Sequence, residues 1–316
     1  MTSKKSRKKP SPKKPPREKT VVKRGSRPAS AVRIIRTIDN MRALVREVRL
    51  RKRSIALVPT MGFLHEGHLS LIREARRRAK LVVVSIFVNP TQFLPGEDLD
   101  RYPRDLPGDR RKVAAAGGDV IFMPEAAEMY PEGFQTFVDV THVTRDLCGA
   151  ARPGHFRGVA TVVTKLFNIV QPDVALFGEK DYQQLQCVRR LAQDLNLPVQ
   201  IVGLPTVRET DGLAMSSRNV YLSPEERGQA LAISRGLQKA RRLFSAGERD
   251  SSELTAAVLD ILRNQSGLEV EYVTVCHPET LERLPAIDRE AVILVAARVG
   301  KTRLIDNARL KGTGRR

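Results

Sequence analysis

Short apolar runs alternate with helical patterns between about residues 55 and 205 of the chain. Several runs are nearly continuous and rich in β-branched residues, which is typical of strands buried on both faces. The predicted strands are 55–58, 81–88, 120–123, 174–177 and 199–202. Helical spacing of apolar residues begins at Leu69 and recurs over 159–169 and 182–195. This alternation predicts an α/β fold with a Rossmann-like, doubly wound parallel sheet.

The pattern changes after about residue 205. Ser223 precedes Pro224 and two acids, which predicts a capped helix start. Helical patterns run to about 245 and over 252–263, and strand patterns follow at 271–276, 291–299 and 303–305. We therefore predict a smaller C-terminal α+β domain. The expected division is a disordered basic extension over 1–30, the Rossmann-like domain over 31–205, and the C-terminal domain over 206–316.

Polar motifs follow three of the predicted strands, at the point where each strand ends. They occupy 59–62, 89–92 and 178–181. In open parallel sheets, ligands bind beyond the carboxyl ends of the strands. Three separate strands are therefore expected to deliver polar side chains to one edge, where a ligand site is predicted.

The segment 59–68 reads Pro-Thr-Met-Gly-Phe-Leu-His-Glu-Gly-His. His65 and His68 are three residues apart, so they share a face of a helix's first turn. Gly67 leaves room beside them, and a helix N-terminus attracts phosphate. A polyphosphate site is the favoured interpretation. Zinc is the alternative, although the spacing is not His-Glu-x-x-His and no third ligand is close in sequence.

The segment 178–184 reads Gly-Glu-Lys-Asp-Tyr-Gln-Gln. Gly178 permits a tight turn, and Lys180 offers a point charge to a phosphate. Asp181 and Gln184 have the spacing of a capping box, which is a structural alternative to a role at a ligand.

Two further loops carry cationic side chains. Residues 215–219, Met-Ser-Ser-Arg-Asn, offer two hydroxyls and the guanidinium of Arg218, which suits a loop over phosphates. Taken alone, this segment is better interpreted as an ordinary polar loop at a domain junction. Arg152, His155 and Arg157 precede a predicted helix and form a weaker candidate anion site.

Charge is unevenly distributed along the 316 residues. The net charge is +20, and residues 1–30 contain 12 Lys and Arg but one acid, Glu18. This segment has no apolar core, so it is not a signal peptide. It is expected to be a solvated extension, with non-specific attraction to nucleic acid as the alternative. Cys148, Cys187 and Cys276 lack metal-ligand spacing, which favours buried thiols in a reducing compartment.

Together these motifs resemble those of the pantoate–β-alanine ligases over roughly residues 31–310. The stretches that carry the resemblance are 59–68, 89–93 (Asn-Pro-x-Gln-Phe), 97–104 (Glu-Asp-Leu-Asp-x-Tyr-Pro-Arg), 177–184 and 211–219. The resemblance implies two steps. Pantoate attacks the α-phosphorus of ATP to give pantoyl adenylate and pyrophosphate, and β-alanine then displaces AMP to give pantothenate. It also implies Mg²⁺ dependence and a cytoplasmic homodimer without membrane association.

The resemblance also assigns roles to residues by motif position. His68, His65, Lys180 and Arg218 are the expected catalytic residues. Those expected at ATP are Met61, Gly62, His65, Gly67, His68, Gly178, Glu179, Lys180, Asp181, Val207, Met215, Ser216, Ser217 and Arg218. Those expected at pantoate or β-alanine are Asn89, Gln92, Tyr102 and Gln184.

The chain departs from the family pattern after Tyr102-Pro103-Arg104. Family members often have an acidic pair there that helps to hold Mg²⁺, whereas this chain has Gly108-Asp109. Asp109 is the expected remaining magnesium ligand, with phosphates and water as the alternative ligands. Two other functions stay open on sequence grounds: another adenylyl-transferring enzyme of the same superfamily, and a nucleic-acid-binding protein that uses the basic extension.

Overall fold

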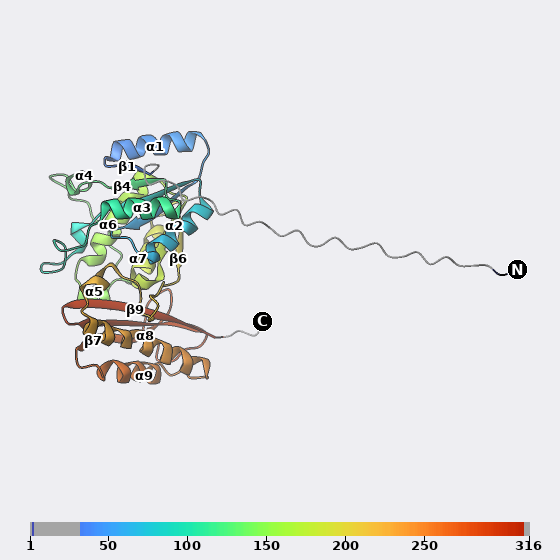
Figure 1. Cartoon of the computed structure of the whole chain (residues 1–316), viewed down its shortest axis with the longest axis vertical. Helices are drawn as coiled ribbons and strands as arrows, with labels where there is room; N and C mark the ends of the chain where they lie inside the picture. The colour runs from blue at the N-terminus through green and yellow to red at the C-terminus, as the bar shows by residue number, and fades with distance from the viewer. Residues whose placement is uncertain (1, 3–31, 313–316) are drawn as a thin grey trace.

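The computed structural model describes residue 2 and residues 32–312 of the chain. Its N-terminal part is built around a six-stranded parallel sheet with the order β1-β4-β3-β2-β5-β6. The strands are β1 (Arg33–Ile35), β2 (Ile55–Thr60), β3 (Leu81–Ile86), β4 (Val120–Phe122), β5 (Val174–Gly178) and β6 (Gln200–Leu204). This arrangement confirms the predicted α/β, Rossmann-like fold (Figure 1).

Helices cover both faces of this sheet. They are α1 (Ile38–Leu50), α2 (Glu66–Arg78), α3 (Leu106–Ala116), α6 (His155–Val170) and α7 (Tyr182–Asp194), with the short α4 (Ala126–Met129) and α5 (Cys148–Ala151) between them. Alternate residues of the strands belong to opposite cores: Leu57 packs with α1, α6 and α7, whereas Val58 packs with α2 and α3. Burial on both faces explains why the strand sequences are continuously apolar.

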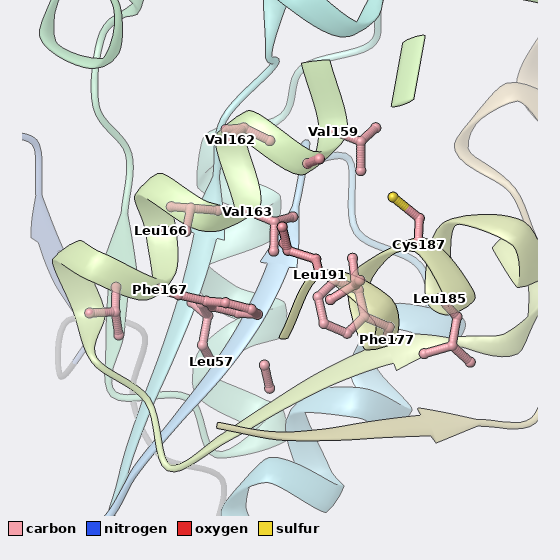
Figure 2. Close-up of a cluster of buried hydrophobic side chains, with 14 of the residues drawn as sticks. Leu57, Val159, Val162, Val163, Leu166, Phe167, Phe177, Leu185, Cys187 and Leu191 are labelled. Carbon is pink, nitrogen blue, oxygen red and sulfur yellow. The ribbon is translucent and has the colours of Figure 1, made fainter. Parts of the chain in front are cut away.

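The core on the α6 and α7 side is dense with branched and aromatic side chains. Figure 2 shows Val159, Val163 and Phe167 of α6 with Phe177 of β5 and Leu57 of β2. Leu57 is completely buried, and Phe177 is 5% exposed. This packing fixes the ends of β2 and β5 relative to each other, so the loops that follow these two strands have a rigid base.

A smaller unit follows β6. It contains α8 (Pro224–Ser245), α9 (Ser251–Arg263) and the antiparallel strands β7 (Leu268–Cys276), β8 (Glu290–Val299) and β9 (Thr302–Lys311) in the order β7-β8-β9. It lies beside the first sheet in Figure 1. The predicted helix start is confirmed, because Ser223 and Glu226 form a capping box at α8. The α+β class is therefore confirmed, and the proposed boundary near residue 205 falls just after β6.

The elements β1, α1, α3, α4 and α5 were not predicted from the sequence. Of these, α1 has an N-cap at Thr37 and buries Met41, Val45 and Val48 at helical spacing. The last strand is also longer than predicted, because β9 pairs with β8 from Thr302 to Lys311. No helix within residues 32–312 is long and apolar enough to cross a membrane.

Candidate active site

The strand order reverses at β2, which places a crevice at its carboxyl end. Chain progression from β2 moves outward to β3 and β4, whereas β5 and β6 lie on its other side. Ligands of doubly wound sheets bind at such a switch point. The loops after β2 and β5, which carry His65 and Lys180, are thereby neighbours, as the sequence motifs predicted.

The loop after β2 turns sharply before α2. Gly62 has a φ of +86°, and a Cβ there would lie 2.9 Å from Ile86 Cγ2. Phe63 follows with a φ of +52°, which is uncommon for a residue with a side chain. Gly67 clears the space next to His65, since a Cβ would lie 2.9 Å from the Cε1 atom of that ring. Both glycines therefore have steric reasons to be in this motif.

The two histidines of this loop stack at the start of α2. Their ring centroids are 4.1 Å apart. The backbone N–H of His65 donates to Nδ1 of His68 at 3.3 Å, which assigns the proton of a neutral His68 to Nε2. Burial, with the charge of Lys180 next, lowers the pKa of His65 to about 4. Burial also lowers the pKa of His68 well below its usual value. Both rings are therefore uncharged N–H donors at neutral pH before a ligand binds.

Asp109 supports the same loop from α3. Its two carboxylate oxygens accept the backbone N–H groups of Phe63 and Leu64, at 2.8 and 2.7 Å. The residue is 1% exposed and is not among the residues that line the crevice. No group of three His, Cys, Asp or Glu side chains within the described residues has the arrangement of a metal site. These contacts do not fit the expected magnesium ligand; they make Asp109 a support for the left-handed turn.

The loop after β5 carries one of the cationic groups of the site. Lys180 is within the short helical turn Glu179–Asp181, and its Nζ lies 3.9 Å from Asp181 Oδ1. Asn307 of β9 donates to the carbonyl oxygens of Glu179 and Lys180 at 2.8 and 3.0 Å. The second domain thus fixes the backbone that carries the lysine. Asn307 was missed at the sequence level, where no motif marked it.

The capping box considered for Asp181 and Gln184 does not form. Asp181 is at the N-cap of α7, yet within residues 32–312 its side chain makes no capping hydrogen bond. Gln184 instead lines the crevice. That alternative is wrong, and Gln184 remains available for a ligand.

Gln92 belongs to the loop after β3 and contacts the loop after β2. Its Nε2 is 3.2 Å from Met61 Sδ, and its Oε1 accepts a hydrogen bond from Asn89 Nδ2 at 3.1 Å. Asn89 is 1% exposed and also accepts from Tyr130 OH at 2.8 Å. A close approach of α6 supports the segment, since a Cβ on Gly158 would lie 2.2 Å from the carbonyl oxygen of Thr91.

The backbone of Gln92 is held by a second network. Nδ1 of His155 lies 2.7 Å from the carbonyl oxygen of Gln92, and Arg152 donates to the same oxygen at 3.1 Å. Arg152 also contacts Nε2 of His155 at 3.0 Å and forms a bidentate ion pair with Glu97. Because arginine only donates, His155 must accept at Nε2 and donate from Nδ1. Burial, followed by the charge of Arg152, lowers the pKa of His155 to about 4.

The weak anion site predicted from residues 152–157 is not one cluster. Arg152 is neutralised by Glu97, and His155 is engaged as described. Arg157 stacks over the ring of Phe137 at 4.4 Å. Arg152 and His155 therefore act together on the backbone of Gln92, whereas Arg157 lies apart from them.

The loop before α8 closes the crevice from the side of the second domain. Ser217 Oγ is 3.3 Å from the carbonyl oxygen of Phe63. Arg218 forms a bidentate ion pair with Asp98, with both nitrogen–oxygen distances at 2.8 Å, and its guanidinium lies 5.7 Å from the ring of Tyr102. The predicted phosphate-binding arginine is thus oriented by a carboxylate that sequence analysis did not single out.

Most predicted site residues line one cavity. Those that do are Met61, His65, Gly67, His68, Asn89, Gln92, Tyr102, Gly178, Lys180, Asp181, Gln184, Val207, Met215, Ser216, Ser217 and Arg218. Gly62 and Glu179 are not among the lining residues; Gly62 shapes the turn, and Glu179 faces Arg309 at 3.6 Å. A second cavity of about 690 Å³ shares Lys180, Gln184 and Arg218 with the first. The two neighbouring cavities are lined by residues of both domains, as expected for a substrate site.

Comparison with known proteins establishes the family of the chain. Residues 33–309 match the sequence model of the family described as pantoate-beta-alanine ligase. The chain belongs to the pantoate–β-alanine ligase family. It is 58% identical over 282 residues to the pantothenate synthetase of Myxococcus xanthus, with 88% of this chain and 96% of that protein covered. It is 56% identical over 275 residues to that of Pelotomaculum thermopropionicum, with 87% and 98% covered.

Solved structures agree with this assignment. The pantothenate synthetase of Thermus thermophilus superposes with a TM-score of 0.85 at 49% identity, covering 89% of this chain and 100% of that one. The pantoate-beta-alanine ligase of Francisella tularensis, described as complexed with beta-gamma ATP and beta-alanine, gives a TM-score of 0.74 at 34% identity, with 90% and 99% covered. The activity that follows from family membership is the ATP-dependent condensation of pantoate with β-alanine.

Proposed function

We propose that the crevice at the end of β2 carries out this condensation with ATP lying between the two histidines and Lys180. The observation that carries the assignment is the meeting of the loops after β2 and β5 at the switch point of the sheet. In the first step, a pantoate carboxylate oxygen bonds to the α-phosphorus, and the bond from that phosphorus to pyrophosphate breaks. In the second, the nitrogen of the neutral β-alanine amine bonds to the pantoyl carbonyl carbon. The bond from that carbon to the adenylate oxygen breaks, AMP leaves, and the nitrogen gives up one proton to solvent.

The neutral histidines supply hydrogen bonds in this proposal. His68 presents a proton at Nε2, because its Nδ1 is occupied by the His65 backbone N–H. Attack by a carboxylate removes no proton, so the first step requires charge stabilisation more than acid–base chemistry. Lys180 places an ammonium group near the reacting phosphate. Arg218 uses Nε and Nη2 on Asp98, so its charge is balanced there and its Nη1 is the nitrogen left to donate to the phosphate.

Pantoate is proposed to lie against the amide side chains. Gln92 and Gln184 line the same cavity as the histidines, with Asn89 and Tyr102 beside them. An amide donates to a carboxylate and accepts from a hydroxyl, and pantoate has both groups. Met61, Val207, Met215 and the two serines at 216 and 217 complete the proposed nucleotide contacts.

Magnesium is proposed to enter with the nucleotide. The carboxylate oxygens of Asp109 already accept backbone N–H groups, so no step is assigned to a metal held by that residue. Mg²⁺ is commonly bound by phosphates and water with few protein ligands. We also propose a cytoplasmic homodimer on the strength of the family resemblance; buried free thiols at Cys148, Cys187 and Cys276 agree with a reducing compartment.

The test is pyrophosphate release and product mass with ATP, Mg²⁺, pantoate and β-alanine. His68→Ala and Lys180→Ala are each expected to lower the rate of adenylate formation by about 10²–10³, the usual cost of removing one preorganised donor. Lys239→Ala on α8 is the control. Near-normal pyrophosphate release by either site variant would remove that residue from the mechanism, and release that does not depend on pantoate would indicate another adenylyl transferase.

A further inference from the structure

The edge of the parallel sheet opposite the active site carries a concentrated positive charge. The loop before β2 contains Arg51, Lys52 and Arg53, and the end of α2 contains Arg76, Arg77 and Arg78 before Lys80. We call these seven residues the basic edge. Both segments lie at the amino ends of β2 and β3, which pair in parallel from Ile55 and Leu81. This surface is therefore separated from the catalytic crevice by the length of the strands.

Hydrogen bonds hold the two segments together. The backbone N–H of Lys80 donates to the carbonyl oxygen of Ser54 at 3.1 Å, and that of Leu81 donates to the same oxygen at 3.0 Å. A shallow hollow of about 380 Å³ results, lined by Arg53, Ser54, Arg76, Arg77, Arg78, Ala79 and Lys80. Five cationic side chains thus converge on one concave surface.

Nearby acids neutralise only part of this charge. Arg76 pairs with Asp119, Arg77 and Arg78 share Glu74, and Arg51 pairs with Glu47. Within residues 32–312, Lys52, Arg53 and Lys80 have no carboxylate within ion-pair distance. Convergence of like charges is unfavourable unless an anion compensates it. The hollow is accordingly electrostatically suited to phosphate groups.

The basic extension joins the folded body at this same edge. Its 12 Lys and Arg precede β1, which begins at Arg33. The backbone N–H of Arg33 donates to the carbonyl oxygen of Asp119 at 3.0 Å, and the carboxylate of Asp119 accepts from Arg76 at 2.8 Å. Arg33, the first residue of β1, is therefore connected to Arg76 of the hollow through Asp119. In sequence, the 12 Lys and Arg of residues 1–30 thus come directly before a strand that begins next to the hollow.

We propose that the basic edge is a binding surface for the phosphate backbone of a nucleic acid. A membrane fits less well, because α1 and α2 bury their apolar residues in the sheet cores and leave no apolar face to insert. Leu50, 85% exposed, is a single apolar side chain next to the surface. Binding of this kind needs no sequence readout, and it leaves the catalytic crevice open.

The test measures binding of the full chain to a fluorescent 20-base-pair DNA duplex by anisotropy at several salt concentrations. The variant is Lys52→Gln, Arg53→Gln and Lys80→Gln combined. The matched control is Arg235→Gln, Lys239→Gln and Arg241→Gln on the exposed face of α8, which removes the same charge. If all three edge residues contact phosphates, the slope of log K against log salt becomes less steep by about 2.7, and affinity at 0.1 M salt falls by up to about 500-fold.

Support requires that the edge variant lose more affinity and more slope than the control, with ligase activity unchanged in both. Equal losses would overturn the proposal, because they would show a net-charge effect alone. Absence of duplex binding by the wild type at 0.1 M salt would also overturn it. Vesicles of phosphatidylserine and phosphatidylcholine are the final arm; binding to them without binding to the duplex would assign the surface to lipid instead.

Discussion

The carbonyl oxygen of Gln92 accepts hydrogen bonds from His155 and Arg152, an arrangement that we call the carbonyl clamp. A substitution of His155 tests directly whether this clamp matters for substrate binding. His155 donates from Nδ1 to the carbonyl oxygen of Gln92 at 2.7 Å, and Arg152 donates to that oxygen at 3.1 Å. His155→Phe removes the shorter of these bonds and keeps a planar ring. One hydrogen bond contributes about 0.5–1.5 kcal/mol, so the pantoate KM is expected to rise about 2- to 13-fold.

The assay is initial pyrophosphate release against pantoate concentration at saturating ATP. His155→Asn retains a donor and is expected to recover part of the loss. Arg157→Gln controls for changes at the start of α6, because Arg157 stacks on Phe137 instead of contacting Gln92. Urea unfolding of each variant separates a binding effect from a stability effect. A pantoate KM that stays at the wild-type value in a folded His155→Phe protein would refute the clamp.

Three further predictions concern the loops and pH. Asp109→Asn leaves the N–H of Phe63 or Leu64 without its acceptor. We therefore expect the free energy of unfolding, measured in urea, to fall by about 1–3 kcal/mol and adenylate formation to become slower. An unchanged free energy of unfolding would show that the left-handed turn needs no such support. Asp98→Asn releases Arg218 from its ion pair and is expected to raise the ATP KM, whereas tighter ATP binding would mean that Asp98 restrains the arginine. Because the pKa of folded His155 is about 4 and that of the unfolded residue is about 6.5, the unfolded chain binds the extra proton between these values. The free energy of unfolding should therefore fall as pH drops from 6.5 to 4, by up to about 3 kcal/mol for this residue, and His155→Phe should flatten that dependence in urea titrations.

The parts of the fold that could be predicted were those with strong local patterns. Strands such as Leu81–Ile86 are buried on both faces, so their composition is distinctive, and Ser223 with Glu226 marks a helix start by local hydrogen bonds. The three-residue strand β1 lacks such a signal, because its place depends on pairing with β4, 87 positions away. Short strands at sheet edges are specified by tertiary contacts more than by their own sequence.

The site residues also divide into those that local sequence patterns could predict and those that they could not. His65, His68 and Lys180 lie in sequence motifs that indicate phosphate binding, and all three line the crevice. Asp98 lies in the stretch 97–104 that carries the resemblance, but no local pattern shows that it pairs with Arg218, 120 positions away. The contact of Asn307 with Lys180, 127 positions away, has no local signal either. Asp109 was noticed for a different reason: a carboxylate near a phosphate site suggests a metal ligand, and only its two backbone contacts point to a supporting role instead.

The positions of these supporting residues explain why a single crevice needs both domains. Strand β5 of the first domain leads into the turn that contains Lys180. Asn307 on β9 of the second domain holds that turn by donating a hydrogen bond to the carbonyl oxygen of Lys180. The arginine comes from the loop before α8, yet its orientation comes from Asp98 of the first domain. Each cationic group is thus placed by an element of the opposite domain. Since the histidines are neutral, the proposed reaction would take its positive charge from groups whose positions depend on these contacts across the domain boundary. We therefore expect relative movement of the domains to displace Lys180 and Arg218 before it displaces the histidines.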